Sequence, residues 1–268
     1  MSVDPNVLLK VNERVALISL NRPDALNATT DDLYSELATI IREVAGREDV
    51  GCVILTGEGR GFCAGADLKA RRDDMTPLER RERHRWILRD ILYPLFQLEK
   101  PVIAAVNGPA AGAGMNLALA CDFVIASDKA SFVQAFAKVG LVPDLGGLWF
   151  LARVVGINRA KELCFTARKV GADEALALGI ANKLVPHDQL IDETMVMARA
   201  IASGSPTAQA MTKSLLNRAG SVTLDQMLDF ESFAQTVAYL TPEYEEGVKA
   251  FREKRSPDFA AAAAAARR

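Results

Sequence analysis

Asp144 is the residue whose surroundings most clearly indicate chemistry. It stands in the stretch "GLVPDLGG", residues 140–147, and it is the only charged residue between Val139 and Arg153. An ionised carboxylate among apolar neighbours is poorly solvated, which raises its pKa toward the range where it can accept and return a proton. The sequence Pro-Asp-x-Gly also fits a turn, and an aspartate ahead of a helical run makes a good N-cap. The residues alone leave both interpretations open.

Two glycine-rich turns could supply a second chemical element. "GEGRGFCAGAD", residues 57–67, follows one apolar run, and "NGPAAGAG", residues 107–114, follows another. A helix that begins near Gly112 leaves its first amides unpaired at the positive end of its dipole. Two such amides, one from each turn, could stabilise an oxygen that becomes negative during a reaction. The alternative is that both segments are plain tight turns.

Other glycine-loop functions fit less well. "GEGRG" lacks the GxGxxG spacing of dinucleotide-binding turns, and "GAGMNL" lacks the Gly-Lys-Ser/Thr of a phosphate-binding loop.

Alternating strands and helices must position these turns. Hydrophobic periodicity and turn residues predict a hairpin (8–12 and 15–20), buried strands (52–56, 101–106 and 123–127) and helices (30–46, 76–98 and 112–120). After residue 188 only helices are expected, over 188–203, 206–219, 223–238 and 242–254. We therefore predict an α/β core over residues 1–200 and a helical C-terminal region over 201–268, with a frayed alanine-rich tail from residue 260.

Composition excludes several classes of protein. The net charge of −2 gives no global attraction to nucleic acid. Four scattered cysteines and two histidines predict neither a metal site nor a disulfide framework, and they fit a reducing cytoplasm. No signal or transit peptide is apparent. Residues 101–121 carry no charge, but prolines, asparagines and glycines interrupt them, so a strand, turn and buried helix are favoured over a membrane span.

Five stretches resemble the enoyl-CoA hydratase/isomerase family, the crotonase superfamily. They are "LNRPDALNA", "GRGFCAGADLK", "PVIAAVNGPAAGAGMNLALACDFVIAS", "FAKVGLVPDLGG" and "EGVKAFREKRSPDF", in the family's order and spacing. The resemblance implies a crotonase-like spiral of βαβ units, and C-terminal helices that assemble a homotrimer, often a dimer of trimers. It also implies an acyl-CoA thioester substrate and no separate cofactor, since coenzyme A is carried as part of the substrate.

The resemblance also assigns residues. The amides of Ala66 and Ala113 match the family's oxyanion-hole positions. A further set matches positions that line or bind coenzyme A or the acyl group, two of them on a neighbouring subunit: Arg22, Ala25, Ala64, Asp67, Leu68, Lys69, Asn116, Phe136, Phe251 and Lys254.

Two departures from the family's hydratases favour a different reaction. Hydratases hold and activate water with two glutamates, whereas this sequence has Asn116 and Phe136 at those positions. An amide is no general base, and a phenyl ring cannot hold water by hydrogen bonds. The VPD-x-GG pattern instead resembles 1,2-epoxyphenylacetyl-CoA isomerases of phenylacetate degradation and Δ3,Δ2-enoyl-CoA isomerases of fatty acid metabolism. That resemblance implies that Asp144 moves a proton between carbons, or lets a ring epoxide rearrange.

Alternative functions remain at this point. One is an enoyl-CoA hydratase or another coenzyme A enzyme, such as an aryl-CoA dehalogenase with a nucleophilic aspartate. Another is a non-catalytic homologue that binds RNA or protein, against which the charge and the 6% aromatic content argue. His84 and His187 belong to no visible triad, and His84 is expected on the solvated face of an arginine-rich helix.

Overall fold

A mostly parallel six-stranded sheet forms the centre of the molecule. The computed structural model describes residues 4–70 and 74–265. Strands β1 (Val7–Asn12) and β2 (Val15–Leu20) form the predicted antiparallel hairpin. From β2 the order continues in parallel through β3 (Cys52–Gly57), β4 (Val102–Val106), β6 (Phe123–Ser127) and β9 (Lys183–Val185). The predicted α/β class is confirmed.

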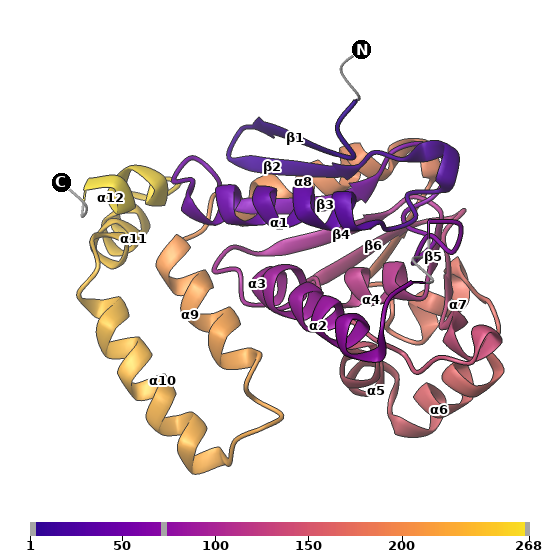
Figure 1. The fold of residues 1–268 in the computed structure, drawn as a ribbon. Helices are drawn as coiled ribbons and strands as arrows, with labels where there is room; N and C mark the ends of the chain where they lie inside the picture. The colour runs from indigo at the N-terminus through magenta and orange to yellow at the C-terminus, as the bar shows by residue number, and fades with distance from the viewer. Residues whose placement is uncertain (1–3, 71–73, 266–268) are drawn as a thin grey trace.

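Both faces of this sheet are covered. Val53 and Leu55 point into a core shared with α1, whereas Cys52 and Ile54 point into a second core shared with α8. Figure 1 shows α8 (Leu190–Ala202) on the side of the sheet opposite to α1 (Asp31–Gly46). Residues on both faces of β3 are therefore buried, which explains the continuous apolar run of this strand.

The predicted long helix over 76–98 contains a change of helical pitch. It begins as α2 (Pro77–Ile87), passes through a π-helical segment (Leu88–Leu92) and ends as α3 (Tyr93–Phe96). Pro94 has no amide hydrogen and its ring clashes with the carbonyl four residues earlier, so regular α-helix cannot continue through it. The Tyr93 amide bonds to the Leu88 carbonyl instead, which takes up one extra residue in that turn.

A second, smaller sheet stands beside the glycine-rich turns. Its order is β5–β7–β8, with β5 (Pro109–Ala111) and β7 (Ser131–Val133) parallel and β8 (Val170–Gly171) antiparallel. Sequence patterns did not predict these very short strands. Helix α4 (Ala113–Leu119) follows β5 directly and is buried along its whole length.

Short helices complete the core. α5 (Gly147–Val155), α6 (Ile157–Thr166) and α7 (Ala172–Ala177) follow the turn that contains Asp144. 3₁₀ turns occupy Pro23–Ala25, Ala135–Val139 and His187–Gln189. Phe96 of α3 contacts Trp149 and Phe150 of α5, at ring-centre distances of 5.5 and 5.3 Å. These edge-on contacts fasten α5 to the helix that runs on from α2.

Four helices form a C-terminal arm, defined here as residues 206–265. They are α9 (Pro206–Leu216), α10 (Leu224–Tyr239), α11 (Pro242–Glu253) and α12 (Phe259–Ala265). Figure 1 shows α9 and α10 standing away from the sheet. The predicted boundary between residues 200 and 201 falls inside α8, which packs on the sheet.

The prediction of a frayed tail is wrong for residues 260–265, which form α12. Alanine has the highest helix propensity, and the Asp258 carboxylate accepts a hydrogen bond from the Ala261 amide at the helix start. Residues 266–268 lie outside the described residues.

A buried lysine joins the arm to the core. Lys213 of α9 is 8% exposed in its side chain, and its Nζ lies 2.7 Å from Asp122 Oδ2 and 3.1 Å from the Lys100 carbonyl oxygen. Both acceptors stand at the starts of neighbouring strands, β4 and β6. By contrast, α10 has no buried residue.

No helix in the described ranges is long and apolar enough to span a membrane.

Candidate active site

The two glycine-rich turns touch at Gly65. Its φ of 87° lies in the left-handed region, and a Cβ at this position would lie 2.7 Å from the Ala111 carbonyl oxygen and 3.5 Å from the Ala113 nitrogen. Gly114 makes the same approach from the other side, since a Cβ there would lie 2.1 Å from the Cys63 carbonyl oxygen. Only glycine permits this backbone contact.

The contact brings two unused amides onto adjoining turns. Thr29 bonds to the residues on either side of Ala66, through the Gly65 carbonyl at 2.7 Å and the Asp67 amide at 3.0 Å, which leaves the Ala66 amide facing away. Ala113 is the first residue of α4, so it has no partner within the helix. Among the described residues, neither amide donates a hydrogen bond. Within the described residues, the predicted pair of donors therefore has no acceptor of its own.

Phe136 covers the turn that carries Ala113. Its ring lies 3.6 Å from the place that a Cβ on Gly112 would occupy, and Phe136 is 8% exposed. The phenyl ring makes this part of the site apolar.

The Asp144 turn is held by one amide side chain and one backbone amide. Leu145 has a φ of 45° and Gly146 a φ of 69°, so two successive residues adopt left-handed backbone. The Asp144 carbonyl accepts hydrogen bonds from Asn116 Nδ2 and the Gly147 amide, both at 2.8 Å. A left-handed leucine costs about 1–2 kcal/mol, which these bonds and the burial of Leu145 offset.

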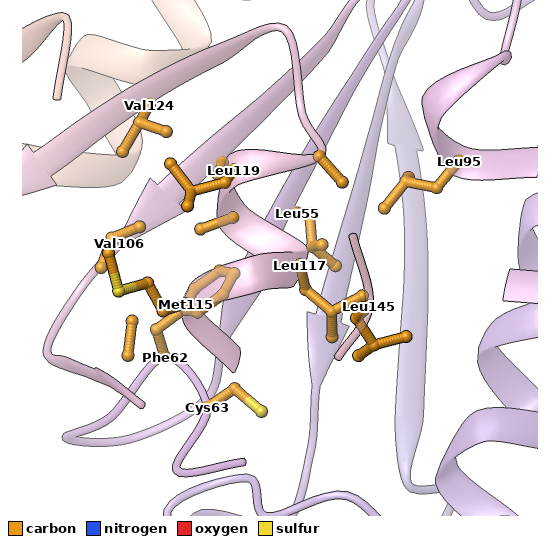
Figure 2. Close-up of a cluster of buried hydrophobic side chains, with 14 of the residues drawn as sticks. Leu55, Phe62, Cys63, Leu95, Val106, Met115, Leu117, Leu119, Val124 and Leu145 are labelled. Carbon is orange, nitrogen blue, oxygen red and sulfur yellow. The ribbon is translucent and has the colours of Figure 1, made fainter. Parts of the chain in front are cut away.

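Side-chain packing fixes the same turn. Figure 2 shows Leu145 beside Leu117 of α4 in the buried cluster. Gln134 Nε2 donates to Asn116 Oδ1 at 2.7 Å, and both side chains are essentially unexposed. Asn116 therefore supports Asp144 through its backbone, and a direct contact between Asn116 and a substrate stays a prediction.

The Asp144 carboxyl is partly buried and mostly unpartnered. Its side chain is 30% exposed, and Oδ1 is buried without any hydrogen-bond partner. Burial raises the pKa of the Asp144 carboxyl, and the positive charge available on His84, the residue's own amide and Arg83 oppose part of that rise. Val142 and Leu148, two apolar residues close to Asp144 in the sequence, are largely exposed, so other residues bury the carboxyl.

The alternative interpretation of Asp144 as a helix cap is wrong. Helix α5 begins at Gly147 with Gly146 as its N-cap, and no side chain caps it. A buried oxygen with no partner costs stability, so its presence calls for a functional reason. Carboxyl groups with a raised pKa are also concentrated at functional sites.

His84 was missed as part of this site. Its Nδ1 lies 4.0 Å from Asp144 Oδ2, and its side chain is 42% exposed. His84 is thus partly solvated, as expected, but it also faces Asp144, which was not expected. The signal that could have found it is Pro94, which forces the change of pitch after α2.

Arg22 and Asp67 join the two loops that flank Ala66. Arg22 Nη2 lies 3.0 Å from Asp67 Oδ2, and Arg22 also donates to the Ala28 carbonyl. The hydrogen bond from Arg22 to Asp67 holds the pKa of the Asp67 carboxyl below its usual range. The Ala64 amide adds a bond of 2.9 Å to the Leu26 carbonyl. Contact of these residues with coenzyme A stays a prediction.

The remaining predicted residues divide into two groups. Ala25 ends the first 3₁₀ turn, and Leu68 and Lys69 are exposed beyond Asp67, so these three lie beside the site. Phe251, at 86% exposed, and Lys254 lie at the end of α11, which Figure 1 shows across the molecule from α4 and β5. One chain does not bring the second group to the site.

Comparison with known proteins follows this geometry. A model of the enoyl-CoA hydratase/isomerase family matches residues 10–262. The 1,2-epoxyphenylacetyl-CoA isomerase of Escherichia coli K12 is 41% identical over 261 residues, covering 94% of this chain and 97% of its own. The short-chain-enoyl-CoA hydratase of Clostridium acetobutylicum is 39% identical, covering 93% and 95%.

Solved structures show the same fold. The crystal structure of an enoyl-CoA hydratase from Bacillus anthracis has a TM-score of 0.89 and 37% identity, covering 94% of this chain and 98% of that chain. An enoyl-CoA hydratase/isomerase from Cupriavidus metallidurans CH34 has a TM-score of 0.89 and 35% identity, covering 97% of each chain.

Proposed function

The chain belongs to the enoyl-CoA hydratase/isomerase family, and from this premise we propose that it is an acyl-CoA isomerase with Asp144 as its single acid–base group. The observation that carries the proposal is the buried, unpartnered Oδ1 of Asp144 on a turn that does not cap a helix. The substrate is a thioester of coenzyme A whose double bond moves, or whose ring epoxide rearranges.

The proposed reaction needs two steps. The thioester oxygen accepts hydrogen bonds from the Ala66 and Ala113 amides. The Asp144 carboxylate then removes a proton from carbon, and the electron pair of that C–H bond passes into a dienolate whose negative oxygen the amides stabilise. The Asp144 carboxylic acid returns the proton at another carbon, which shifts the double bond. These steps use acid–base chemistry alone, so we propose no cofactor.

Hydration is the second candidate, because relatives with that name are also similar to this chain. The site supports it less well. Asn116 already spends its amide on Asp144 and Gln134, and Phe136 places a ring over Gly112, so neither holds a water molecule for attack. The name of the E. coli relative contains a phenylacetyl group, which favours an aromatic acyl group in the substrate of this chain as well.

A self-associating arm is part of the proposal. Apolar side chains of α10 are exposed, and a groove of about 700 Å³ lies between α9 and α10. Large exposed apolar patches indicate an interface, so we propose a homotrimer, or a dimer of trimers, of a cytoplasmic enzyme. Phe251 and Lys254 would then contact coenzyme A bound to a neighbouring subunit. Sedimentation should show monomers for Phe233→Glu and the native assembly for Asp229→Asn.

Absorbance of the conjugated thioester tests the reaction. An isomerase makes this absorbance rise with a 3-enoyl-CoA, whereas a hydratase makes it fall with a 2-enoyl-CoA. A binding protein without activity changes neither. We expect the rise, and its loss in Asp144→Asn. A fall with the 2-enoyl-CoA and no reaction of the 3-enoyl-CoA would contradict the proposal.

A further inference from the structure

Helix α2 presents a second proton-exchanging group to Asp144. His84 Nδ1 lies 4.0 Å from Asp144 Oδ2, and the imidazole is 42% exposed while the Asp144 side chain is 30% exposed. One end of the pair therefore reaches solvent and the other reaches the interior. Imidazole is the side chain best suited to pass protons near neutral pH.

The two carboxyl oxygens of Asp144 have different surroundings. Oδ1 is buried and has no partner, whereas Oδ2 is the oxygen near His84. Because Oδ1 is enclosed, Oδ2 is the carboxyl oxygen that a substrate carbon can approach, and it is also placed to exchange a proton with a neighbouring base.

The position of His84 depends on the π-helical segment. Phe96, which contacts α5, is twelve residues after His84, or about 3.3 turns of regular α-helix, so the two would face different directions. The extra residue in Leu88–Leu92 leaves eleven to be accommodated, about 3.1 turns, which brings both onto one side. The segment that packs on α5 therefore also turns His84 toward Asp144. Asp144 lies two residues before Gly146, the N-cap of α5.

Other charged and titratable groups near Asp144 are already committed. Arg83 pairs with Asp31 of α1 at 2.6 Å, and Tyr34 of α1 is buried, with a raised pKa caused mainly by burial. Among the described residues, no other charged side chain lies within ion-pair distance of Asp144. His84 is the neighbour that can change its proton content.

We propose that His84 is a proton relay that connects Asp144 with solvent during isomerisation, an inference that rests on the proposed function. The substrate proton joins Oδ2, and its C–H electron pair enters the dienolate. A small rotation of the His84 ring shortens the 4.0 Å separation to a hydrogen bond, through which the lone pair of Nδ1 accepts this proton. The imidazolium then gives a proton to water, and the reverse sequence returns a solvent proton to Asp144. A fraction of the product therefore carries hydrogen from water.

Isomerisation of a 3-enoyl-CoA in D₂O tests the relay. Mass spectrometry of the native enzyme's product should show solvent deuterium at the carbon that gains hydrogen. In His84→Gln this fraction should fall at least about threefold while kcat falls less than about tenfold, because proton return within Asp144 continues. His187→Gln is the matched control, since these are the two histidines of the chain, and it should match the native enzyme. An unchanged fraction in His84→Gln would overturn the relay.

Chemical rescue separates relay from support. In His84→Ala, added imidazole should restore deuterium incorporation, which a purely structural role would not allow. Failure of imidazole to restore it, in a folded variant that still turns over, would count against the proposal.

A measurement without turnover keeps the two proposals apart. The chemical shifts of the two histidine ring signals are recorded by NMR in the full-length protein. Because His84 Nδ1 lies 4.0 Å from Asp144 Oδ2, Asp144→Asn should move the His84 signals and leave those of His187 unchanged. If His84 signals also stay unchanged, the relay is wrong whatever the activity. Activity retained by Asp144→Asn would instead overturn the proposed function.

Discussion

The two halves of the candidate site are built by opposite means. The half that contains Ala66 and Ala113 is made of backbone amides, and its geometry rests on close contacts at Gly65 and Gly114. The half that contains Asp144 is made of one side chain. In the proposed reaction, the backbone half would serve many acyl thioesters, because every thioester has the same oxygen, whereas the side-chain half would decide which carbon exchanges a proton.

Under the proposed mechanism, this difference would let relatives with different names share one fold. The protein from E. coli is called an isomerase and that from C. acetobutylicum a hydratase, at 41% and 39% identity. A donor pair made of backbone survives the exchange of side chains around it. The reaction can then change with a few residues that face the acyl group.

Removing the acid should have the largest effect. Asp144→Asn keeps the size of the side chain but removes the base, so kcat should fall about 10³-fold or more. The amides of Ala66 and Ala113 are untouched, so the dissociation constant of an acyl-CoA product analogue should change less than about threefold. Calorimetry and steady-state kinetics measure both. A tenfold loss of binding would show that the two halves are not separable.

Closing the contact between the turns should have the next largest effect. A Cβ in Gly114→Ala meets the Cys63 carbonyl oxygen, which must shift the loop that carries Ala66. We expect kcat to fall about 10²-fold and the free energy of unfolding to fall by about 1–3 kcal/mol. Gly46→Ala is the control, because nothing lies within 4 Å of a Cβ there. Full activity in Gly114→Ala would contradict the backbone origin of this half.

Weakening the support of Asp144 should have a smaller effect. Asn116→Ala removes one of the two bonds to the Asp144 carbonyl but leaves the Gly147 amide bond. We expect a loss of about tenfold in kcat with little change in acyl-CoA affinity, and about 1–2 kcal/mol less stability. A rise in KM alone would show that Asn116 contacts substrate instead.

The cost of the acid should appear in stability. Burial raises the pKa of the folded Asp144 carboxyl above the value near 3.9 of an unfolded aspartate. Proton binding by Asp144 therefore stabilises the native protein at low pH. This stabilisation is lost as the pH rises from the unfolded pKa through the folded pKa, whereas the stability of Asp144→Asn has no such dependence on pH. The melting-temperature difference in favour of the variant should grow from acid to neutral pH, by about 2–4 °C per kcal/mol. A difference that is constant with pH would contradict the burial effect.

The smallest effect is expected where only a side chain of the backbone half changes. Ala66→Ser keeps the amide and adds one oxygen at an exposed position, so activity should change less than about threefold. Loss of activity comparable to that of Asp144→Asn would show that side chains govern this half too.

The sequence predicts the backbone half well for a physical reason. Glycines at close contacts and uncharged strands are local requirements, so "GRGFCAGAD" and "NGPAAGAG" indicate the turns directly. The hairpin, the buried strands and the helices over 30–46 and 223–238 are confirmed within a few residues.

Long-range geometry is what the sequence could not give. His84 faces Asp144 because a π-helical turn changes the direction of everything before it, and a period of 3.6 applied to residues 76–98 misses this. The bond from Gln134 to Asn116 joins residues 18 positions apart, and the bond from Asn116 to Asp144 joins residues 28 positions apart. The short strands β5, β7 and β8 carry too few residues for a pattern.

The buried Lys213 ties the position of the arm to the finished sheet. Its two acceptors, Asp122 and the Lys100 carbonyl, become neighbours only when β4 and β6 have paired. Without that pairing α9 lacks this ion pair, so the apolar surface of the arm is held less firmly. In the proposed assembly, subunits would therefore favour partners whose interior is complete.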